Sequence, residues 1–288
     1  MKTKNIQVPL RDGVMGAHVA FPDRAPAGAV IAIMEIWGVN DTMRRHAAEF
    51  AEAGFVCLVP DLFWRQEPGV ELYDSRPQDV KKAFDLYYDF DYDLGVRDME
   101  DTAKYLEGIP ECNGRVGAVG YCLGGKLCYL MCCRTDIDCA VAYYGTYIEH
   151  RIREAPTLHR PFLLHMAMKD RWVQAEVNEL LERRLSPNPL VTIHKYPGAD
   201  HAFARHGGKT YSKPEADRAL ALTVDFFKKH RGEGKSKFAY RQRSRWPRRL
   251  LLRRARRRRR TRPRPSACSC RSRREAAMTS WRATSGRN

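Results

Sequence analysis

Gly120-Tyr121-Cys122-Leu123-Gly124 places glycines two positions before and two positions after a cysteine. This spacing is typical of a sharp turn between a strand and a helix, because a side chain at either glycine would collide with the neighbouring strand or helix. Such a turn holds the Cys122 sulfur above the edge of a sheet and aims the backbone N–H of Leu123 at an oxyanion forming there. The stretch therefore predicts a cysteine nucleophile on a strand–turn–helix unit.

The segments on both sides of this turn alternate between strand and helix patterns. Short apolar runs predict strands over residues 29–34, 55–59, 115–119, 139–144, 161–168 and 190–196. Amphipathic patterns predict helices over residues 41–53, 79–90, 95–107, 173–185 and 214–230, and another directly after Cys122. A hairpin is expected from residues 6–10 to 15–21 around Asp12-Gly13, and a long loop over residues 60–78. The alternation predicts an α/β domain with a doubly wound, mostly parallel sheet and helices on both faces.

The charge of the chain is divided unevenly. The formal net charge is +17, but residues 231–288 carry 22 Lys and Arg against 2 Asp and Glu, whereas residues 1–230 carry 29 against 32. We expect one domain over residues 1–230 and a basic tail over 231–288 that is too poor in apolar residues to fold. The tail could bind nucleic acid or another polyanion, be a solvated extension, or result from a shifted reading frame in GC-rich DNA, which we favour.

Cysteine usage and the N-terminus indicate a reducing compartment. Seven of the nine cysteines lie before residue 231, an odd number that fits free thiols better than a disulfide framework. No Cys/His group has the spacing of a zinc site, so we expect no metal. The N-terminus lacks the apolar stretch of a signal peptide, and no run approaches the ~20 apolar residues of a membrane span. A cytoplasmic protein, with no membrane partner, is expected.

Four chemically capable side chains each follow a predicted strand: Glu35, Cys122, Asp170 and His201. Active sites of such sheets lie at the carboxyl ends of the strands. A thiol attacks a carbonyl group only as the thiolate, so it needs a histidine that a carboxylate orients. The order Cys122, Asp170, His201 predicts a nucleophile, an acid and a base in that sequence.

Other interpretations stay open for each member of this set. Asp170 could cap a helix that opens at Arg171-Trp172-Val173, and Asp200 could supply the acid instead. His201 could be an ordinary loop histidine, and His206 is its one serious rival as the base. Glu35 could be a satisfied carboxylate at the sheet edge.

Two further stretches carry a family resemblance. Glu35-Ile36-Trp37-Gly38-Val39-Asn40, together with Gly120-Tyr121-Cys122-Leu123-Gly124-Gly125 and the segment from Gly198 to Arg205, resembles the dienelactone hydrolase family over residues 5–230. The resemblance implies a single α/β-hydrolase domain that needs no metal or cofactor. It implies hydrolysis of a small enol-lactone that carries a carboxylate. The expected substrate is dienelactone and the expected product is maleylacetate. We expect a monomer, with nucleic acid unlikely as a partner except through the tail.

The resemblance also assigns roles to residues beside the triad. Glu35 would accept the thiol proton of Cys122 once substrate is bound. The backbone N–H groups of Leu123 and Ile36 would form the oxyanion hole. Arg205 would bind the substrate carboxylate, although it could equally be a solvated surface arginine.

The family's second substrate arginine has no counterpart here, because Val80 stands at that position. Lys81 or Lys82 could replace it, Arg76 lies a turn back, or the preferred substrate could differ. Phe84, Tyr87 and Tyr144 match positions that line the family's pocket, but aromatic residues in such a pattern also suit a plain core. The rival functions are a promiscuous esterase of the same family and a polyanion-binding protein.

Overall fold

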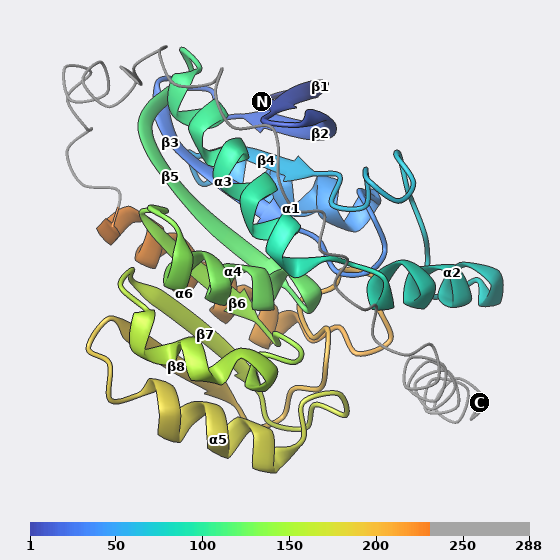
Figure 1. The fold of residues 1–288 in the computed structure, drawn as a ribbon, viewed down its shortest axis with the longest axis vertical. Helices are drawn as coiled ribbons and strands as arrows, with labels where there is room; N and C mark the ends of the chain where they lie inside the picture. The colour runs from blue at the N-terminus through green and yellow to red at the C-terminus, as the bar shows by residue number, and fades with distance from the viewer. Residues whose placement is uncertain (231–288) are drawn as a thin grey trace, which may run out of the picture. The chain divides into compact units, whose positions relative to one another are not determined.

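The computed structural model describes residues 1–230, where the eight strands form one sheet (Figure 1). The strand order is β1-β2-β4-β3-β5-β6-β7-β8. The strands are β1 (Lys2–Leu10), β2 (Gly13–Phe21), β3 (Ala27–Ile33), β4 (Val56–Pro60), β5 (Cys112–Tyr121), β6 (Cys139–Tyr143), β7 (Phe162–Ala167) and β8 (Val191–Tyr196). The first two strand pairings are antiparallel and the other five are parallel. The mostly parallel sheet is confirmed, and the expectations for the basic tail lie outside the described residues.

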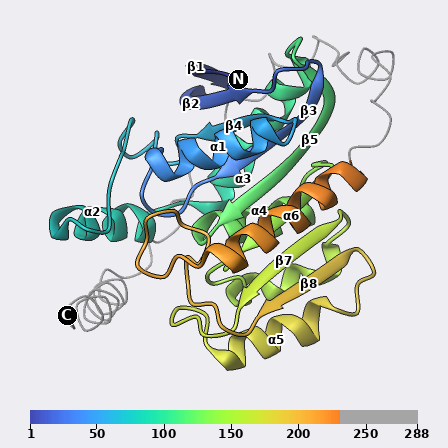
Figure 2. The same cartoon turned by 180° about the vertical axis from the view of Figure 1, so that it is seen from behind.

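Helices lie on both faces of the sheet, as the alternation of patterns predicts. They are α1 (Asp41–Glu52), α2 (Pro77–Tyr88), α3 (Tyr92–Gly108), α4 (Leu123–Arg134), the 3-10 helix η1 (Glu149–Thr157), α5 (Ala175–Leu185) and α6 (Lys213–His230). Figure 1 shows α3 and α4 in front of the sheet, and the reverse view in Figure 2 shows α1 and α6 on its other face. Helix α2 extends to one side of the sheet.

Two of the elements that differ from their predicted bounds, β5 and α5, do so for local reasons. Strand β5 begins at Cys112, three residues before the predicted start, because Gly114 takes a positive φ of 85° and lets pairing with β3 continue through an irregularity in the register. Helix α5 begins at Ala175, because the backbone N–H groups of Trp172 and Val173 donate to Asp170 and close a turn first. Nothing in the sequence pattern predicted η1.

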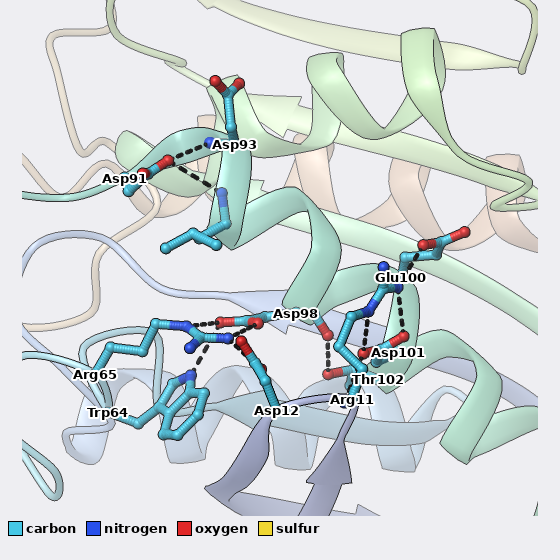
Figure 3. Close-up of polar contacts among 11 residues, drawn as sticks. Arg11, Asp12, Trp64, Arg65, Asp91, Asp93, Asp98, Glu100, Asp101 and Thr102 are labelled. Carbon is cyan, nitrogen blue, oxygen red and sulfur yellow. Dashed lines mark hydrogen bonds and ion pairs between the residues drawn. The ribbon is translucent and has the colours of Figure 1, made fainter. Parts of the chain in front are cut away.

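Helix α3 is held by polar contacts at its N-terminus and near its middle (Figure 3). The Asp91 side chain caps it by accepting hydrogen bonds from the backbone of Asp93 and Leu94. Further along, the buried carboxylate of Asp98 accepts from Arg65, and Arg11 in the β1–β2 turn donates to Asp101. These contacts hold the N-terminal hairpin and the segment after β4 against the helix.

The parallel core brings four strand ends to one edge of the sheet. Strands β3, β5, β6, β7 and β8 run side by side in the same direction. Their carboxyl ends therefore meet, and Glu35, Cys122, Asp170 and His201 each follow one of them within five residues. Among residues 1–230 no helix is both long and apolar enough to span a bilayer.

Candidate active site

Cys122 occupies a strained turn between β5 and α4. Its φ of 53° lies in the left-handed region, which costs a residue with a Cβ of order 1–3 kcal/mol. A Cβ on Gly120 would lie 2.0 Å from the carbonyl oxygen of Gly124, and one on Gly124 would lie 2.4 Å from that of Ile33. Both glycines are therefore required by close backbone approach, as the spacing predicts.

His201 and Asp170 form a buried pair beside this turn. The Nδ1 atom of His201 lies 2.8 Å from Oδ2 of Asp170, and the Asp170 side chain is 1% exposed. The other oxygen, Oδ1, accepts hydrogen bonds from the backbone of Trp172 at 2.7 Å and Val173 at 3.1 Å. Asp170 thus closes a turn and contacts the histidine at the same time, so the two interpretations offered for it are compatible.

The electrostatics of His201 favour its protonated form. Burial lowers its pKa, but the charges of Asp170 and Cys122 and hydrogen bonds to both raise it more, to about 10. An imidazolium beside a sulfur atom stabilises a thiolate, the form of cysteine that attacks a carbonyl carbon.

The two rival residues point elsewhere. The Asp200 carboxylate accepts a hydrogen bond from Nε of Arg171 at 3.1 Å and another from the backbone of His201 at 2.6 Å. His206 places Nε2 2.7 Å from Oε1 of Glu49 on α1. Neither residue takes part in the Asp170–His201 pair.

Arg205 and Glu35 form a second charge pair at the same edge, in which Glu35 is buried and Arg205 is partly buried. Nε of Arg205 lies 2.7 Å from Oε2 of Glu35, and Nη1 lies 2.7 Å from Oδ2 of Asp74. The guanidinium also packs over the Trp37 ring, 5.5 Å from its centre. With its side chain 16% exposed, Arg205 is not a freely solvated surface residue.

Several polar atoms of this cluster have no hydrogen-bond partner. Among the described residues, Oε1 of Glu35 and the hydroxyl of Tyr144 are buried and unpaired, and the Arg205–Glu35 contact is an ion pair without an aligned hydrogen bond. Buried polar groups are normally satisfied, so each such atom requires an explanation. Glu35 is therefore not the fully satisfied carboxylate of the alternative interpretation.

Backbone strain gathers at the same edge. The non-glycine residues of the described chain with positive φ are Cys122, Tyr144, Tyr147 and Ala202. All four lie in the turn after β5, the segment after β6 or the loop that carries His201. Strain of this kind clusters at functional sites, which supports the assignment of this edge as the site.

Aromatic side chains surround the histidine. Tyr144 packs edge-on against His201, with 5.0 Å between ring centres, and Trp172 lies 6.5 Å from it. Phe84 contacts Trp172 at 5.8 Å, and Tyr87 donates to or accepts from Thr146 at 3.1 Å. All three aromatic residues singled out in the sequence are buried, and they reach the site directly or through one neighbour.

The two lysines proposed to replace the second arginine lie on the exposed side of α2. Nζ of Lys81 is 2.6 Å from Asp85, and that of Lys82 is 2.5 Å from Glu67. Arg76 packs over the ring of Tyr73. The structure does not bring these cations to Arg205.

Two backbone N–H groups stand where an oxyanion hole is expected. Leu123 is the first residue of α4, so its N–H has no acceptor within the helix. Ile36 follows Glu35 at the end of β3 and is buried. Their role in stabilising an oxyanion stays a prediction.

Sequence reasoning missed two residues that contact the candidate machinery. Oγ1 of Thr146 lies 3.8 Å from the Cys122 sulfur, and Asp74 holds Arg205 from a long loop. Neither belongs to a local motif, and each is brought to the site by a connection between distant segments. Trp172, by contrast, adjoins Asp170 and could have been noted with it.

Comparison with known proteins shows the family and the fold of the chain. The family model described as the dienelactone hydrolase family matches residues 15–231. A putative carboxymethylenebutenolidase from Azospirillum brasilense is 38% identical over 232 residues, covering 77% of this chain and 96% of the relative. A carboxymethylenebutenolidase from Pseudomonas putida is 36% identical over 227 residues, covering 78% and 96%.

A solved structure shares the architecture. The putative dienelactone hydrolase from Klebsiella pneumoniae superposes with a TM-score of 0.72 at 23% identity, covering 79% of this chain and 98% of that one. This structural similarity shows the α/β-hydrolase fold, and the sequence matches show the family. The chain is therefore a hydrolase of ester or lactone bonds that belongs to the dienelactone hydrolase family.

Proposed function

We propose that this enzyme opens a small enol-lactone bearing a carboxylate, with Cys122 as the nucleophile. The observation that carries the proposal is the meeting of a cysteine turn, a His201–Asp170 pair and a partly buried arginine at one sheet edge. Cys122 and the His201–Asp170 pair can perform acyl transfer, and Arg205 provides a cation for a carboxylated substrate. The names of the relatives, carboxymethylenebutenolidases, agree with this substrate class.

The first half-reaction forms an acyl-enzyme. The Cys122 thiolate attacks the lactone carbonyl carbon, and the N–H groups of Leu123 and Ile36 donate to the resulting oxyanion. The oxyanion then collapses, the ring C–O bond breaks, and the enolate oxygen leaves while remaining tethered to the acyl group. Because a tethered enolate can close the ring again, deacylation must be faster than reclosure.

The Arg205–Glu35 pair suggests how substrate binding would increase the share of Cys122 that is present as thiolate. Without substrate, Arg205 holds one oxygen of Glu35, while the other oxygen has no partner. A substrate carboxylate that binds Arg205 would compete for the guanidinium and weaken its hold on Glu35. Glu35 could then accept the thiol proton of Cys122, which leaves the sulfur as the attacking thiolate.

The second half-reaction uses the His201–Asp170 pair. Acylation removes the negative charge of the sulfur, which is one of the interactions that raise the pKa of His201. The pKa therefore falls in the acyl-enzyme, and His201 gives its proton to the departing enolate oxygen. The neutral imidazole can then take a proton from water. The water oxygen bonds to the acyl carbon, the C–S bond breaks, and the Cys122 sulfur leaves as thiolate.

The proposal is tested by assaying dienelactone hydrolysis and by mass spectrometry of the intact protein. Cys122→Ala should abolish turnover, whereas Cys133→Ala, a matched change on the helix that follows Cys122, should keep it. His201→Ala should accumulate an adduct of substrate mass on Cys122, because deacylation lacks its base. Full activity in Cys122→Ala would contradict the assignment of Cys122 as the nucleophile. An unchanged KM in Arg205→Ala would contradict the assignment of Arg205 as the residue that binds the substrate carboxylate.

One observation favours a broader substrate range within the same chemistry. Lys81 and Lys82 pair with carboxylates on the exposed side of α2, so Arg205 is left to bind a substrate carboxylate without their help. Arg205 already contacts two carboxylates. A panel of neutral and carboxylated esters and lactones separates the two cases, since a promiscuous esterase would show similar kcat/KM for both kinds.

A further inference from the structure

Three metal-ligating side chains meet outside the proposed catalytic machinery: His46, Glu49 and His206. Nδ1 of His46 lies 3.0 Å from Oε2 of Glu49, and Nε2 of His206 lies 2.7 Å from Oε1. One possible ligand atom from each residue lies within 4.8 Å of the other two. Two imidazoles and a carboxylate therefore converge on one small volume.

The fold holds each ring of this cluster in place. His46 and Glu49 are three residues apart on α1, a spacing that puts both on one face of the helix. The His46 ring stacks on Tyr121, with 4.4 Å between centres and 8° between planes. His206 comes from the loop between β8 and α6, where its ring packs against Tyr211.

This donor set suits a zinc ion. Two histidines and one glutamate are a common three-ligand set for Zn²⁺, with the fourth position left open for water. Ligands about 2.1 Å from a tetrahedral ion lie about 3.4 Å apart, so a small rotation of the Glu49 carboxylate away from both rings would admit it. The side chains of His46, Glu49 and His206 are 5%, 20% and 13% exposed, so the cluster is enclosed but open to entry.

The charge states also fit ligation. Burial disfavours the charged form of Glu49, but the His46 hydrogen bond and the neighbouring His46, His206 and Arg45 charges lower the pKa of its carboxyl overall. Burial lowers the pKa of His206 and outweighs the effect of Glu49. An ionised carboxylate and a neutral imidazole are the ligating forms. Arg45 lies 3.7 Å from Oε1 of Glu49 and competes for this carboxylate.

We propose that His46, Glu49 and His206 form a zinc-binding site that ties helix α1 to the loop carrying His201 and Arg205. His206 follows Arg205 directly in the chain, and Tyr121, beneath His46, directly precedes Cys122. The ion touches neither the thiol nor the substrate. Its effect is to restrain the Arg205 loop, so it acts on substrate binding more than on the chemical step.

The test is direct binding to the full chain after chelator treatment. Titration with Zn²⁺ by calorimetry should show one equivalent bound, and Co²⁺ should give the visible absorption of a tetrahedral nitrogen and oxygen site without a thiolate charge-transfer band. Glu49→Gln and His206→Ala should each weaken binding by at least about 100-fold. His159→Ala, which changes an exposed histidine far along the chain, should bind as the wild type does.

Arg45→Gln should change the Zn²⁺ affinity in the opposite direction to Glu49→Gln and His206→Ala. Removing the competing cation should tighten Zn²⁺ binding several-fold and enlarge the rise in Tm that Zn²⁺ produces. Equal Zn²⁺ affinity in the wild type, Glu49→Gln and His206→Ala would overturn the proposal, because the ion would then bind elsewhere. Absence of binding, with no effect of Arg45→Gln, would also overturn it and leave the cluster as a hydrogen-bonded link.

Discussion

His201 and His206 lie five residues apart on one loop, and each contacts a carboxylate, at 2.8 Å and 2.7 Å respectively. Their electrostatics are nevertheless opposite. Burial lowers the pKa of both, but Asp170 and Cys122 raise that of His201 to about 10, whereas the pKa of His206 stays below its ordinary value. The distance to the nearest carboxylate therefore does not decide the charge of a buried histidine.

The difference lies in what else each carboxylate contacts. Asp170 is 1% exposed, gives one oxygen to His201 and satisfies the other with two backbone N–H groups. Glu49 is 20% exposed and is shared among His206, His46 and Arg45. The cationic neighbours of Glu49 also repel a proton on His206. A carboxylate that contacts one histidine raises the pKa of that histidine strongly, whereas a carboxylate shared among three basic groups does so less.

The largest expected effect is the difference in kcat/KM between the variants His201→Ala and His206→Ala. His201→Ala should lower kcat/KM for a carboxylated lactone by about 10³-fold or more, the usual loss when a positioned base is removed. His206→Ala should lower it by less than about tenfold, mainly through KM, because it only supports the loop that carries Arg205. Steady-state kinetics of both variants measure this contrast. Equal losses would mean that the loop acts as a single unit.

The second prediction concerns the pKa values themselves. Asp170→Asn removes the main interaction that raises the pKa of His201, so burial should dominate and the pKa should fall from about 10 toward or below its ordinary 6.5. Glu49→Gln should lower the pKa of His206 further, since Glu49 raises it. NMR titration of the imidazole resonances gives both values. A His201 pKa that stays near 10 in Asp170→Asn would refute the assigned cause.

A third, smaller effect concerns Arg205, between the two histidines. Asp74 lies on a loop, is 33% exposed and contacts the guanidinium. Asp74→Asn should lower KM for a carboxylated substrate about two- to fivefold, the range expected for a partly exposed ion pair, with kcat little changed. Kinetics with carboxylated and neutral esters provide the control, because the neutral substrate should show no such gain.

The smallest effect is on stability as a function of pH. Because its pKa is raised, His201 contributes to the free energy of unfolding in full below pH 6.5. That contribution is lost as the pH rises through about 10. The lowered pKa of His206 works in the opposite direction, because its contribution is lost as pH falls below 6.5. Urea unfolding of His206→Gln should therefore show less acid destabilisation than the wild type, by under about 1 kcal/mol. A larger loss in acid for the variant would reverse this sign.

Local patterns account for much of the fold. The glycines around Cys122, the β-branched runs and the Asp-Gly turn are short-range signals, and the sheet with helices on both faces follows from their alternation. The exceptions have local causes that a pattern cannot show. The start of α5 depends on which backbone groups the Asp170 side chain binds, and β5 continues through Gly114 because β3 is beside it.

The candidate site was predictable to a different extent. Residues that follow parallel strands can be expected to meet, because their strand ends share an edge, and the Asp170–His201 contact shows such a meeting. The lysines of α2 could not be placed in this way, since one turn of a helix decides whether a side chain faces the site or solvent. Their ion pairs with Asp85 and Glu67 direct them outward.

The sequence by itself determined the fold class, the family and the residues able to do the chemistry, because these depend on local spacing and on the order of strands. Only the tertiary structure decided what each ionisable group faces. Asp74 meets Arg205 across 131 residues, and His206 meets Glu49 across more than 150, so no spacing rule could pair them. Charge interactions depend on separation in space and on burial, and those are properties of the folded chain.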